Sequence, residues 1–493
     1  MSRGAPRVAG ALALVGAIAC AVPVSAAGRD QDLVRAHRSL YPAAEVAAAR
    51  ASGSEGVQRA YDAARDLQEA ARRSAPVSAG CRPLRRALGR YAVGRVRQME
   101  GVDRPSAGDR AGGRRSAETA RRRVAASARA CRGRGGAPAR RPAAMSPVDG
   151  EAFFGTVVAR APRGADAAEL VVDGRPAATA PVTAGRARFA LEGSGTRSLR
   201  IAFTRAERVV GVSRARRAML LPPSARRAVP GSRSSAALTA LSRAMAGGPR
   251  YRAAWVQDLT SGEAAGVNAD AAFPAASTVK LGLLAGALAR LGASPERSRY
   301  AHDLRAMAAW SSNLATNRLL RRLGGTATAA DGLRRLGARS STFTGEYIVG
   351  TQLQPALPGS AAGAAPPRTS RRVTTARDLA RMLYAIHAAA AGAPGARAGT
   401  GLTAHQARLA LGWLLASQQR AGNVSLLAGG APPGSPIAQK NGWIRSARHA
   451  AGIVYAPAGP AIAVLLTYDA SGVRLGTARA LGGRVAALAV RRG

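Results

Sequence analysis

The fold is decided by the stretch Phe273-Pro274-Ala275-Ala276-Ser277-Thr278-Val279-Lys280, which leads into an apolar run that ends at Leu288. The Ala-Ser-Thr that follows the proline is typical of a helix start, and the apolar run predicts a buried helix. Ser277 is then expected in the first turn, where backbone N–H groups point outward and carry partial positive charge. Lys280 lies three residues further on, so its amine is expected on the same helix face as the Ser277 hydroxyl.

The Ser277–Lys280 pair has the chemistry of a nucleophile and its base. A helix N-terminus stabilises a serine alkoxide and any oxyanion that forms beside it. A partly desolvated Lys has its charged form disfavoured, so its amine can take a proton from the serine hydroxyl. The chain contains only two lysines, Lys280 and Lys440, among 73 Lys and Arg residues. Because Arg does not give up its proton and a desolvated Lys does, both lysines call for a chemical explanation.

Two further short motifs follow in the chain. Ser311-Ser312-Asn313 comes after one predicted helix and before another, and Lys440-Asn441-Gly442 precedes a predicted strand. With Ser277 and Lys280 they resemble the three boxes of the penicillin-recognising serine hydrolases, and of class A β-lactamases in particular, which are Ser-x-x-Lys, Ser-Asp-Asn and Lys-Thr-Gly. The resemblance covers residues 236–493. It implies an α/β domain in which an antiparallel sheet is flanked by helices and joined to a helical lobe.

The resemblance implies a role for each residue of the boxes. Ser277 would be the nucleophile, Lys280 would take its proton either directly or through a water, and Ser311 would relay a proton to the leaving nitrogen. Asn313 would hydrogen-bond the amide side chain of the substrate, while Lys440 would attract the substrate carboxylate and lower the pKa of Lys280. The backbone N–H groups of Ser277 and Trp443 would form the oxyanion hole. The expected substrate-binding residues are therefore Asn313, Lys440, Asn441, Gly442 and Trp443.

Class A enzymes also carry a Glu on an omega loop, which activates the water that deacylates the enzyme. The resemblance places this residue at Glu346, and Asn317 matches the family Asn that holds it. Glu346 is the only carboxylate between Asp331 and Asp378. The alternative is that Glu346 is a solvated loop residue.

Several features depart from the class A pattern. Ser312 replaces the Asp of the second box, and Asn441 replaces the Thr or Ser of the third, which removes a hydroxyl that would bind the substrate carboxylate. Trp443 is bulky beside the expected oxyanion hole, and Gly350 stands where the family has an Asn. The interval 277–311 is short, so part of the helical lobe is missing. These departures weigh more against efficient β-lactam turnover than against acylation.

The formal net charge of +46 would suggest nucleic-acid binding in a cytoplasmic protein. Residues 1–26 indicate another compartment, because a basic start, a short apolar core and Val24-Ser25-Ala26 are typical of a cleaved secretory signal peptide. Cys20 leaves a lipoprotein as the alternative. We therefore expect a secreted or envelope-attached protein and no nucleic-acid partner.

Residues 29–145 predict a basic helical domain. Removal of the signal peptide leaves Cys81 and Cys131, which favours a disulfide in an oxidising compartment over two separate buried thiols. No cluster of Cys, His and carboxylates has metal-ligand spacing, so we expect neither a metal nor a cofactor. The Arg runs of this domain indicate either a solvated face or adhesion to anionic wall polymers or lipid headgroups.

Residues 147–222 alternate apolar and polar positions with period two, which predicts a small all-β sandwich. This segment shows no catalytic constellation and is expected to be a spacer or binding module. Residues 223–235, rich in Pro, Arg and Ser, predict a linker to the hydrolase domain at 236–493.

Three functions remain open. The first is a serine hydrolase that opens the amide of β-lactam antibiotics through an acyl-enzyme at Ser277, as in antibiotic resistance. The second is a D,D-carboxypeptidase, a penicillin-binding protein acting on peptidoglycan stem peptides. The third is a wall-binding scaffold without catalysis. The first two require Ser277 and both lysines, whereas the third does not.

Overall fold

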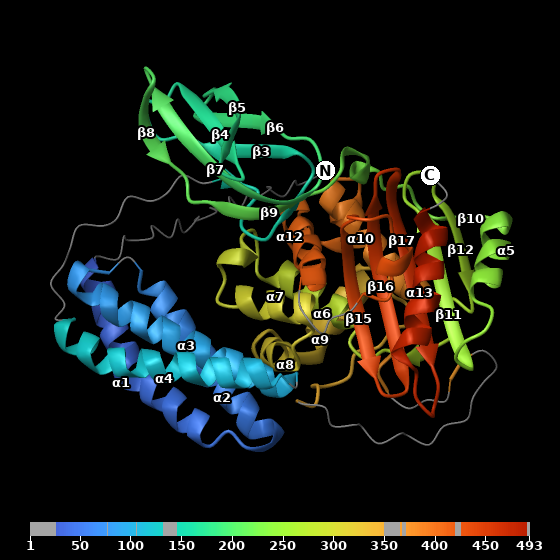
Figure 1. Cartoon of the computed structure of the whole chain (residues 1–493), viewed down its shortest axis with the longest axis horizontal. Helices are drawn as coiled ribbons and strands as arrows, with labels where there is room; N and C mark the ends of the chain where they lie inside the picture. The colour runs from blue at the N-terminus through green and yellow to red at the C-terminus, as the bar shows by residue number, and fades with distance from the viewer. Residues whose placement is uncertain are drawn as a thin grey trace, which may run out of the picture.

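The computed structural model describes residues 26–75, 77–104, 106–131, 145–349, 365–366, 371–419 and 425–490. Residues 1–25 of the predicted signal peptide, with Cys20, and Gly350 lie outside these residues. The described chain forms a helical region, a β region and a C-terminal α/β region (Figure 1). Within the described residues, no helix is long and apolar enough to cross a membrane.

The helical region packs long helices around one core. Its helices are α1 (Ala26–Ala49), α2 (Gly53–Arg73), α3 (Arg82–Asp103) and α4 (Ala107–Ala130). Apolar residues at helical spacing, such as Leu67, Leu84, Leu88 and Tyr91, are fully buried between them. α3 and α4 approach closely at Gly113, where a Cβ atom would lie 2.4 Å from the backbone nitrogen of Gln98.

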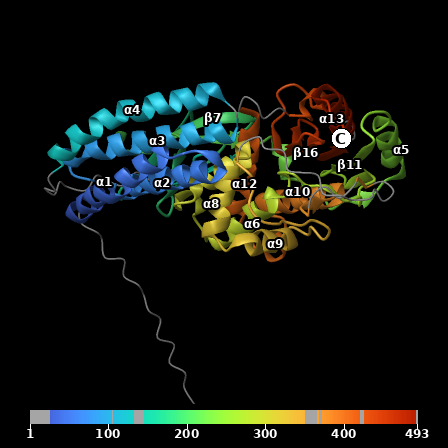
Figure 2. The same cartoon turned by 90° about the horizontal axis from the view of Figure 1, so that it is seen from below.

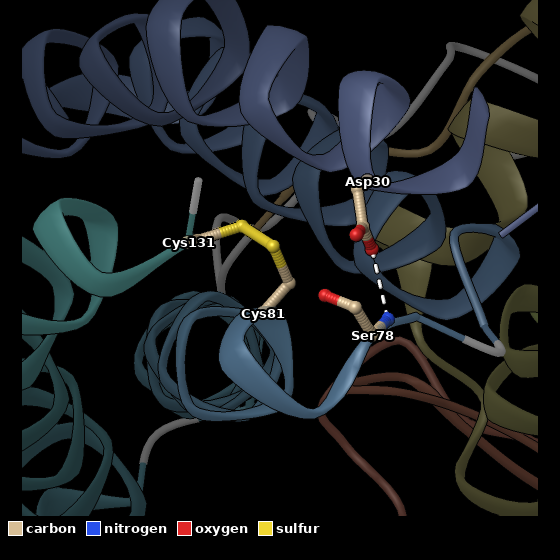
Figure 3. Close-up of a disulfide and its surroundings, with 4 residues drawn as sticks. All are labelled: Asp30, Ser78, Cys81 and Cys131. Carbon is tan, nitrogen blue, oxygen red and sulfur yellow. Dashed lines mark hydrogen bonds between the residues drawn. A yellow bond between two sulfur atoms is a disulfide. The ribbon is translucent and has the colours of Figure 1, made fainter. Parts of the chain in front are cut away.

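A disulfide closes one end of the helical region (Figure 3). It joins Cys81, the last residue of the 3-10 helix η1 (Ala79–Cys81), to Cys131, which follows α4 directly. The backbone N–H of Ser78 donates to Asp30 Oδ1 of α1 at 3.0 Å. The segment between α2 and α3 is therefore tied to both outer helices.

Residues 145–220 form two sheets that share one core. The smaller sheet has the order β1-β3-β6, and the larger has the order β2-β9-β7-β4-β5 with β8 paired to β7. Leu199, Ile201 and Phe203 of β7 are buried while Arg200 is exposed, as the period-two pattern predicts. The strands are β1 (Met145–Ser146), β2 (Ala152–Phe153), β3 (Thr156–Arg160), β4 (Ala167–Val172), β5 (Arg175–Pro181), β6 (Arg186–Ala190), β7 (Gly195–Arg205), β8 (Arg208–Val212) and β9 (Arg216–Leu220).

A six-stranded sheet organises the C-terminal region. Its order is β10-β12-β11-β17-β16-β15, with β10 parallel to β12 and the other neighbours antiparallel. Helices cover both of its faces, so the central strands are buried on each side and consist of nearly continuous apolar runs. The strands are β10 (Ser232–Arg233), β11 (Tyr251–Asp258), β12 (Glu263–Val267), β15 (Ile437–Ile444), β16 (Ala447–Ala456) and β17 (Gly459–Tyr468).

The helices of this region form two layers with separate cores. α5 (Ser235–Ala244) and α13 (Leu475–Val490) cover one face of the sheet, and α10 (Ala376–Ala391) and α12 (Ala404–Leu415) cover the other. The other elements of this region include the helices that pack beyond α12 and a two-stranded ladder of β13 with β14. Their bounds are α6 (Lys280–Arg290), α7 (Ala301–Trp310), α8 (Asn313–Arg322), α9 (Gly325–Arg335), α11 (Ala396–Thr400), β13 (Phe273–Pro274) and β14 (Val373–Thr374), with 3-10 helices η2 (Pro223–Arg226), η3 (Pro295–Arg297), η4 (Ala416–Gln419) and η5 (Ala428–Gly430).

The segment predicted as a linker, residues 223–235, is packed against the C-terminal region. The backbone N–H of Val229 donates to Leu259 O at 2.8 Å, and that of Ser232 donates to Gly262 O at 2.7 Å. The segment joins the β region to the C-terminal region, as expected of a linker, and it also adds the edge strand β10 to the main sheet. Composition indicated a loop, but the open edge of β12 supplies the backbone partners that order it.

The helical region also packs against the C-terminal region. Figures 1 and 2 both place α2 and α3 beside α8. Val57 and Tyr61 of α2 and Met99 of α3 share one apolar cluster with Trp310 and Leu314. The helical and C-terminal regions therefore bury a common core.

Candidate active site

Ser277 lies in a turn between β13 and α6. The helix begins at Lys280, slightly later than the sequence predicts, and a tighter turn precedes it, in which the Lys280 N–H donates to Ser277 O at 3.3 Å. Ala276 adopts a left-handed conformation with φ of 47°, which is uncommon for a residue with a Cβ. His449 hydrogen-bonds Pro274 O through Nε2 at 2.8 Å, and the Thr278 hydroxyl donates to Ala275 O at 2.7 Å. Buried bonds thus hold both sides of this strained turn.

The Lys280 amine is the centre of the site. The side chain is only 1% exposed. Its Nζ donates to Ser311 O at 2.8 Å and to Asn313 Oδ1 at 2.7 Å, and lies 3.4 Å from Ser311 Oγ. Ser311 caps the end of α7 in a left-handed conformation with φ of 61°. The first and second boxes therefore meet at this amine.

Asn313 links Lys280 to a neighbouring loop. Its Oδ1 accepts from Lys280, and its Nδ2 donates to Ile348 O at 2.8 Å. The sequence predicts a substrate-binding role for this side chain, and in the structure its amide is engaged within the protein on both sides.

The charges around Lys280 disfavour its protonation. Burial lowers the pKa of Lys280 well below its ordinary value, and the positive charge of Lys440 lowers it further. Arg372 and Arg104 act in the same direction, while Asp103 opposes them. Burial also lowers the pKa of Lys440 to about 7. Burial and the neighbouring cations therefore favour the neutral Lys280 amine, which is the form that can act as a base.

The third box lies on β15, the edge strand of the main sheet. Lys440 is 2% exposed and donates through Nζ to Asn441 O at 2.9 Å. Gly442 allows β15 to approach the Ser277 turn closely, since a Cβ atom there would lie 2.8 Å from Thr278 Cγ2 and 2.9 Å from Ala275 O. Trp443 follows, half-buried, with the Arg448 guanidinium 5.1 Å from its ring centre.

Tyr347 covers Lys280 and was not identified from the sequence. The Lys280 Nζ lies 4.2 Å from the centre of the Tyr347 ring, and the Tyr347 hydroxyl donates to Ala276 O at 3.0 Å. Burial raises the pKa of Tyr347 to about 12, so the phenol keeps its proton at neutral pH. The Arg372 guanidinium also stacks on this ring, with its central carbon 3.8 Å from the ring centre.

The expected contact between Asn317 and Glu346 is wrong. Asn317 instead holds the backbone of the next residue, because the Tyr347 N–H donates to Asn317 Oδ1 and Asn317 Nδ2 donates to Tyr347 O, both at 2.8 Å. Glu346 is exposed and accepts two hydrogen bonds from Arg321, at 2.5 and 2.6 Å. The family match at Asn317 indicated a contact with this loop, but Asn317 binds the backbone of Tyr347, which is one residue after the predicted Glu346.

Among the described residues, no group of three or more His, Cys, Asp and Glu side chains is placed to hold a metal ion. Two surface hollows, of about 460 and 580 Å³, contain no residue of the three boxes in their linings.

Comparison with known proteins gives a family match over the same part of the chain. Residues 235–299 and 296–492 match the model described as the beta-lactamase enzyme family. A comparison with curated proteins found no match.

Similar solved structures cover about half of the chain. One is a point mutant of PBP-A as an acyl-enzyme complex with penicillin G, at 20% identity over 52% of this chain and 97% of that chain, with a TM-score of 0.39. Another is a β-lactamase from Desulfarculus baarsii, at 21% identity over 51% and 96%, with a TM-score of 0.41. A third is a β-lactamase from Streptosporangium roseum, at 18% identity over 52% and 98%, with a TM-score of 0.41.

Proposed function

The chain belongs to the beta-lactamase enzyme family, and on this premise we propose that Ser277 opens the amide of β-lactams by forming an acyl-enzyme. The observation that carries the proposal is the buried Lys280 amine, which is hydrogen-bonded to the second box and has a strongly lowered pKa. The first two boxes meet at this amine, and the third lies against the Ser277 turn.

The acylation step follows from this arrangement. The neutral Lys280 amine takes the proton of Ser277, whose Oγ attacks the carbonyl carbon of the lactam. As the C–N bond breaks, the proton passes from Lys280 through the Ser311 hydroxyl, 3.4 Å from the amine, to the leaving nitrogen. The backbone N–H groups of Ser277 and Trp443 stabilise the oxyanion, while Lys440 in its charged form attracts the substrate carboxylate.

The second candidate function is a penicillin-binding D,D-carboxypeptidase acting on peptidoglycan stem peptides, and Tyr347 favours it. A protonated phenol covers Lys280, and the carboxylate of Glu346 is paired with Arg321 at the surface. Neither group is suited to activate a water for deacylation of a β-lactam. We therefore propose slow turnover of the penicilloyl-enzyme, which favours penicillin binding over rapid penicillin hydrolysis.

Intact mass spectrometry over time after addition of penicillin G tests both candidates. We expect an adduct of one penicillin that persists on the wild type and is absent from Ser277→Ala. Ser194→Ala, in the exposed part of the β region, is the matched control and should be labelled as the wild type is. A transient adduct would identify an efficient β-lactamase. The absence of any adduct would contradict both catalytic candidates and favour the non-catalytic scaffold.

The Arg-rich face of α4 supports a proposal about location. Arg114, Arg115, Arg122 and Arg123 are all exposed on this helix. We propose that this face binds anionic cell-wall polymers or lipid surfaces after export by the signal peptide. Changing these four residues to Gln should weaken low-salt binding to cell-wall preparations several-fold, and wild-type binding should fall as salt rises. If the variant binds as the wild type does, the Arg runs are only a solvated face.

A further inference from the structure

A carboxylate from the helical region reaches the second box. Asp103, the last residue of α3, is 6% exposed. Its Oδ2 accepts from the Asn313 N–H at 2.8 Å and from the Ser312 hydroxyl at 3.3 Å. Ser312 is the residue that replaces the Asp of the family box. A carboxylate is therefore present at this position, but it comes from a residue 210 positions earlier in the chain than Asn313.

The Asp103 carboxylate lies at the N-terminus of α8, where a negative charge is favourable. Ser312 is the N-cap of α8, and its hydroxyl also accepts from the Ala315 N–H at 3.2 Å. Negative charge at a helix N-terminus is stabilised by the unpaired N–H groups and by the helix dipole. Asp103 is thereby held firmly against the turn that carries Asn313.

Two further residues of the helical region hold the same part of the site. The Gln58 side chain of α2 donates to Leu314 O at 3.1 Å and accepts from Asn317 Nδ2 at 3.3 Å. The Ser54 hydroxyl accepts from the Val349 N–H at 3.2 Å. α2 therefore supports both α8 and the loop that places Tyr347 over Lys280.

We infer that Asp103 is a positioning residue for acylation: it holds the Ser312–Asn313 turn so that Ser311 O and Asn313 Oδ1 meet the Lys280 amine. The inference rests on the proposed acylation of Ser277. It makes the active site a composite, in which the C-terminal region supplies the reacting groups and the helical region supplies an anion that orders them.

The negative charge of Asp103 also counteracts the effect of neighbouring positive charges on the pKa of Lys280. Lys440, Arg372 and Arg104 all disfavour a protonated Lys280, and the Tyr347 ring faces the amine without a charge. Asp103 is the group that opposes these cations. Its removal should lower the pKa of Lys280 further, an effect that a purely steric support would not produce.

The experiment measures acylation by a fluorescent penicillin as a function of pH. Asp103→Ala should slow acylation by about 10-fold or more, since the general base loses its alignment. Asp103→Asn keeps an acceptor for the Asn313 N–H, so we expect a smaller loss and an acid limb shifted to lower pH. The control is Asp66→Asn, which removes a carboxylate that pairs with Arg318 at the same interface and should behave as the wild type.

A second measurement separates this inference from the proposed function. Because the chain has only two lysines, protein labelled with ¹³C-lysine gives two Cε signals to titrate by NMR. The Lys280 signal should move to lower pH in Asp103→Asn and remain in place in Asp66→Asn. Unchanged titration together with wild-type acylation in the Asp103 variants would overturn the inference. A wild type that never labels would instead overturn the proposed function.

Discussion

The helical region and the β region both precede the C-terminal region in the chain, but they are joined to it in different ways. The helical region shares an apolar cluster with α7 and α8 and hydrogen-bonds the second box. The β region has a core of its own and also adds Val148 and Ala152 to the main core of the C-terminal region. Its strands β2 and β9 contact α12, where buried Glu151 pairs with Arg408 and His405, and these ion pairs involve no residue of the three boxes. A region that precedes the catalytic residues in the chain therefore contributes to the active site only where its own segments contact that site, whatever the distance in sequence.

The largest effect is expected at the buried ion pair between the helical region and the C-terminal region. Arg65 of α2 donates to Asp303 of α7 at 3.1 Å, and the two side chains are 3% and 0% exposed. Arg65→Met should lower the free energy of unfolding by about 3 kcal/mol, because it removes one of the cations that pair with the buried Asp303 carboxylate, Arg318 being another. Chemical denaturation measures the loss, with exposed Arg59→Met on the same helix as the control. A loss no larger than that of Arg59→Met would show that the two regions are not coupled as described.

The stability of the contact between the β region and α12 should depend on pH, and this dependence should not affect acylation. Burial lowers the pKa of His405, but its hydrogen bonds to Glu151 and Glu296 outweigh burial and raise that pKa from 6.5 to about 9. Stability from this contact is therefore complete below pH 6.5 and is lost as pH rises through about 9.

His405→Gln should remove this part of the pH dependence of the melting temperature and leave penicillin labelling unchanged. Thermal melts across the range from pH 6.5 to about pH 9 check the first point, with the wild type as reference. If labelling falls with His405→Gln, the β region is coupled to the active site after all.

The smallest effect is expected at Glu346. Because its carboxylate is paired with Arg321 on the exposed side of the loop, Glu346→Gln should change deacylation only slightly. A general base would be worth about 10² to 10⁴ in rate. The decay of the penicilloyl adduct by intact mass distinguishes the two. A strong accumulation of adduct in the variant would restore Glu346 as the deacylating base.

The site residues that the sequence predicted lie in elements formed by neighbouring residues. The residues that it missed are positioned by contacts with residues that are distant in the sequence. Ser277, Lys280, Ser311, Asn313 and Lys440 sit in short motifs, and the local helix starts and strand that carry them are encoded by neighbouring residues. Tyr347 was missed because its position depends on the backbone register of a loop against Asn317, which composition does not determine. Asp103 was missed because its partners are far away in the sequence and no local pattern marks the end of α3 as part of a site.

At the level of the fold, the short 277–311 interval indicated that part of a helical lobe was missing, and helices were predicted for residues 29–145. The sequence did not connect the two observations. Docking of α2 and α3 onto α8 depends on a packed apolar surface with Tyr61 and Trp310, and such surfaces are recognised only once the partners face each other. The open edge that orders residues 223–235 is a tertiary effect of the same kind.

The burial of both lysines has a practical consequence for chemical labelling. Lys280 and Lys440 are 1% and 2% exposed, so the positive charge on the described surface comes from Arg. Amine-directed reagents, such as succinimidyl esters, therefore find no lysine on that surface. Guanidinium groups also stay charged at alkaline pH, where an ammonium surface would lose its charge. The protein should keep its cationic character under basic conditions, and any slow lysine modification would report on opening of the active site.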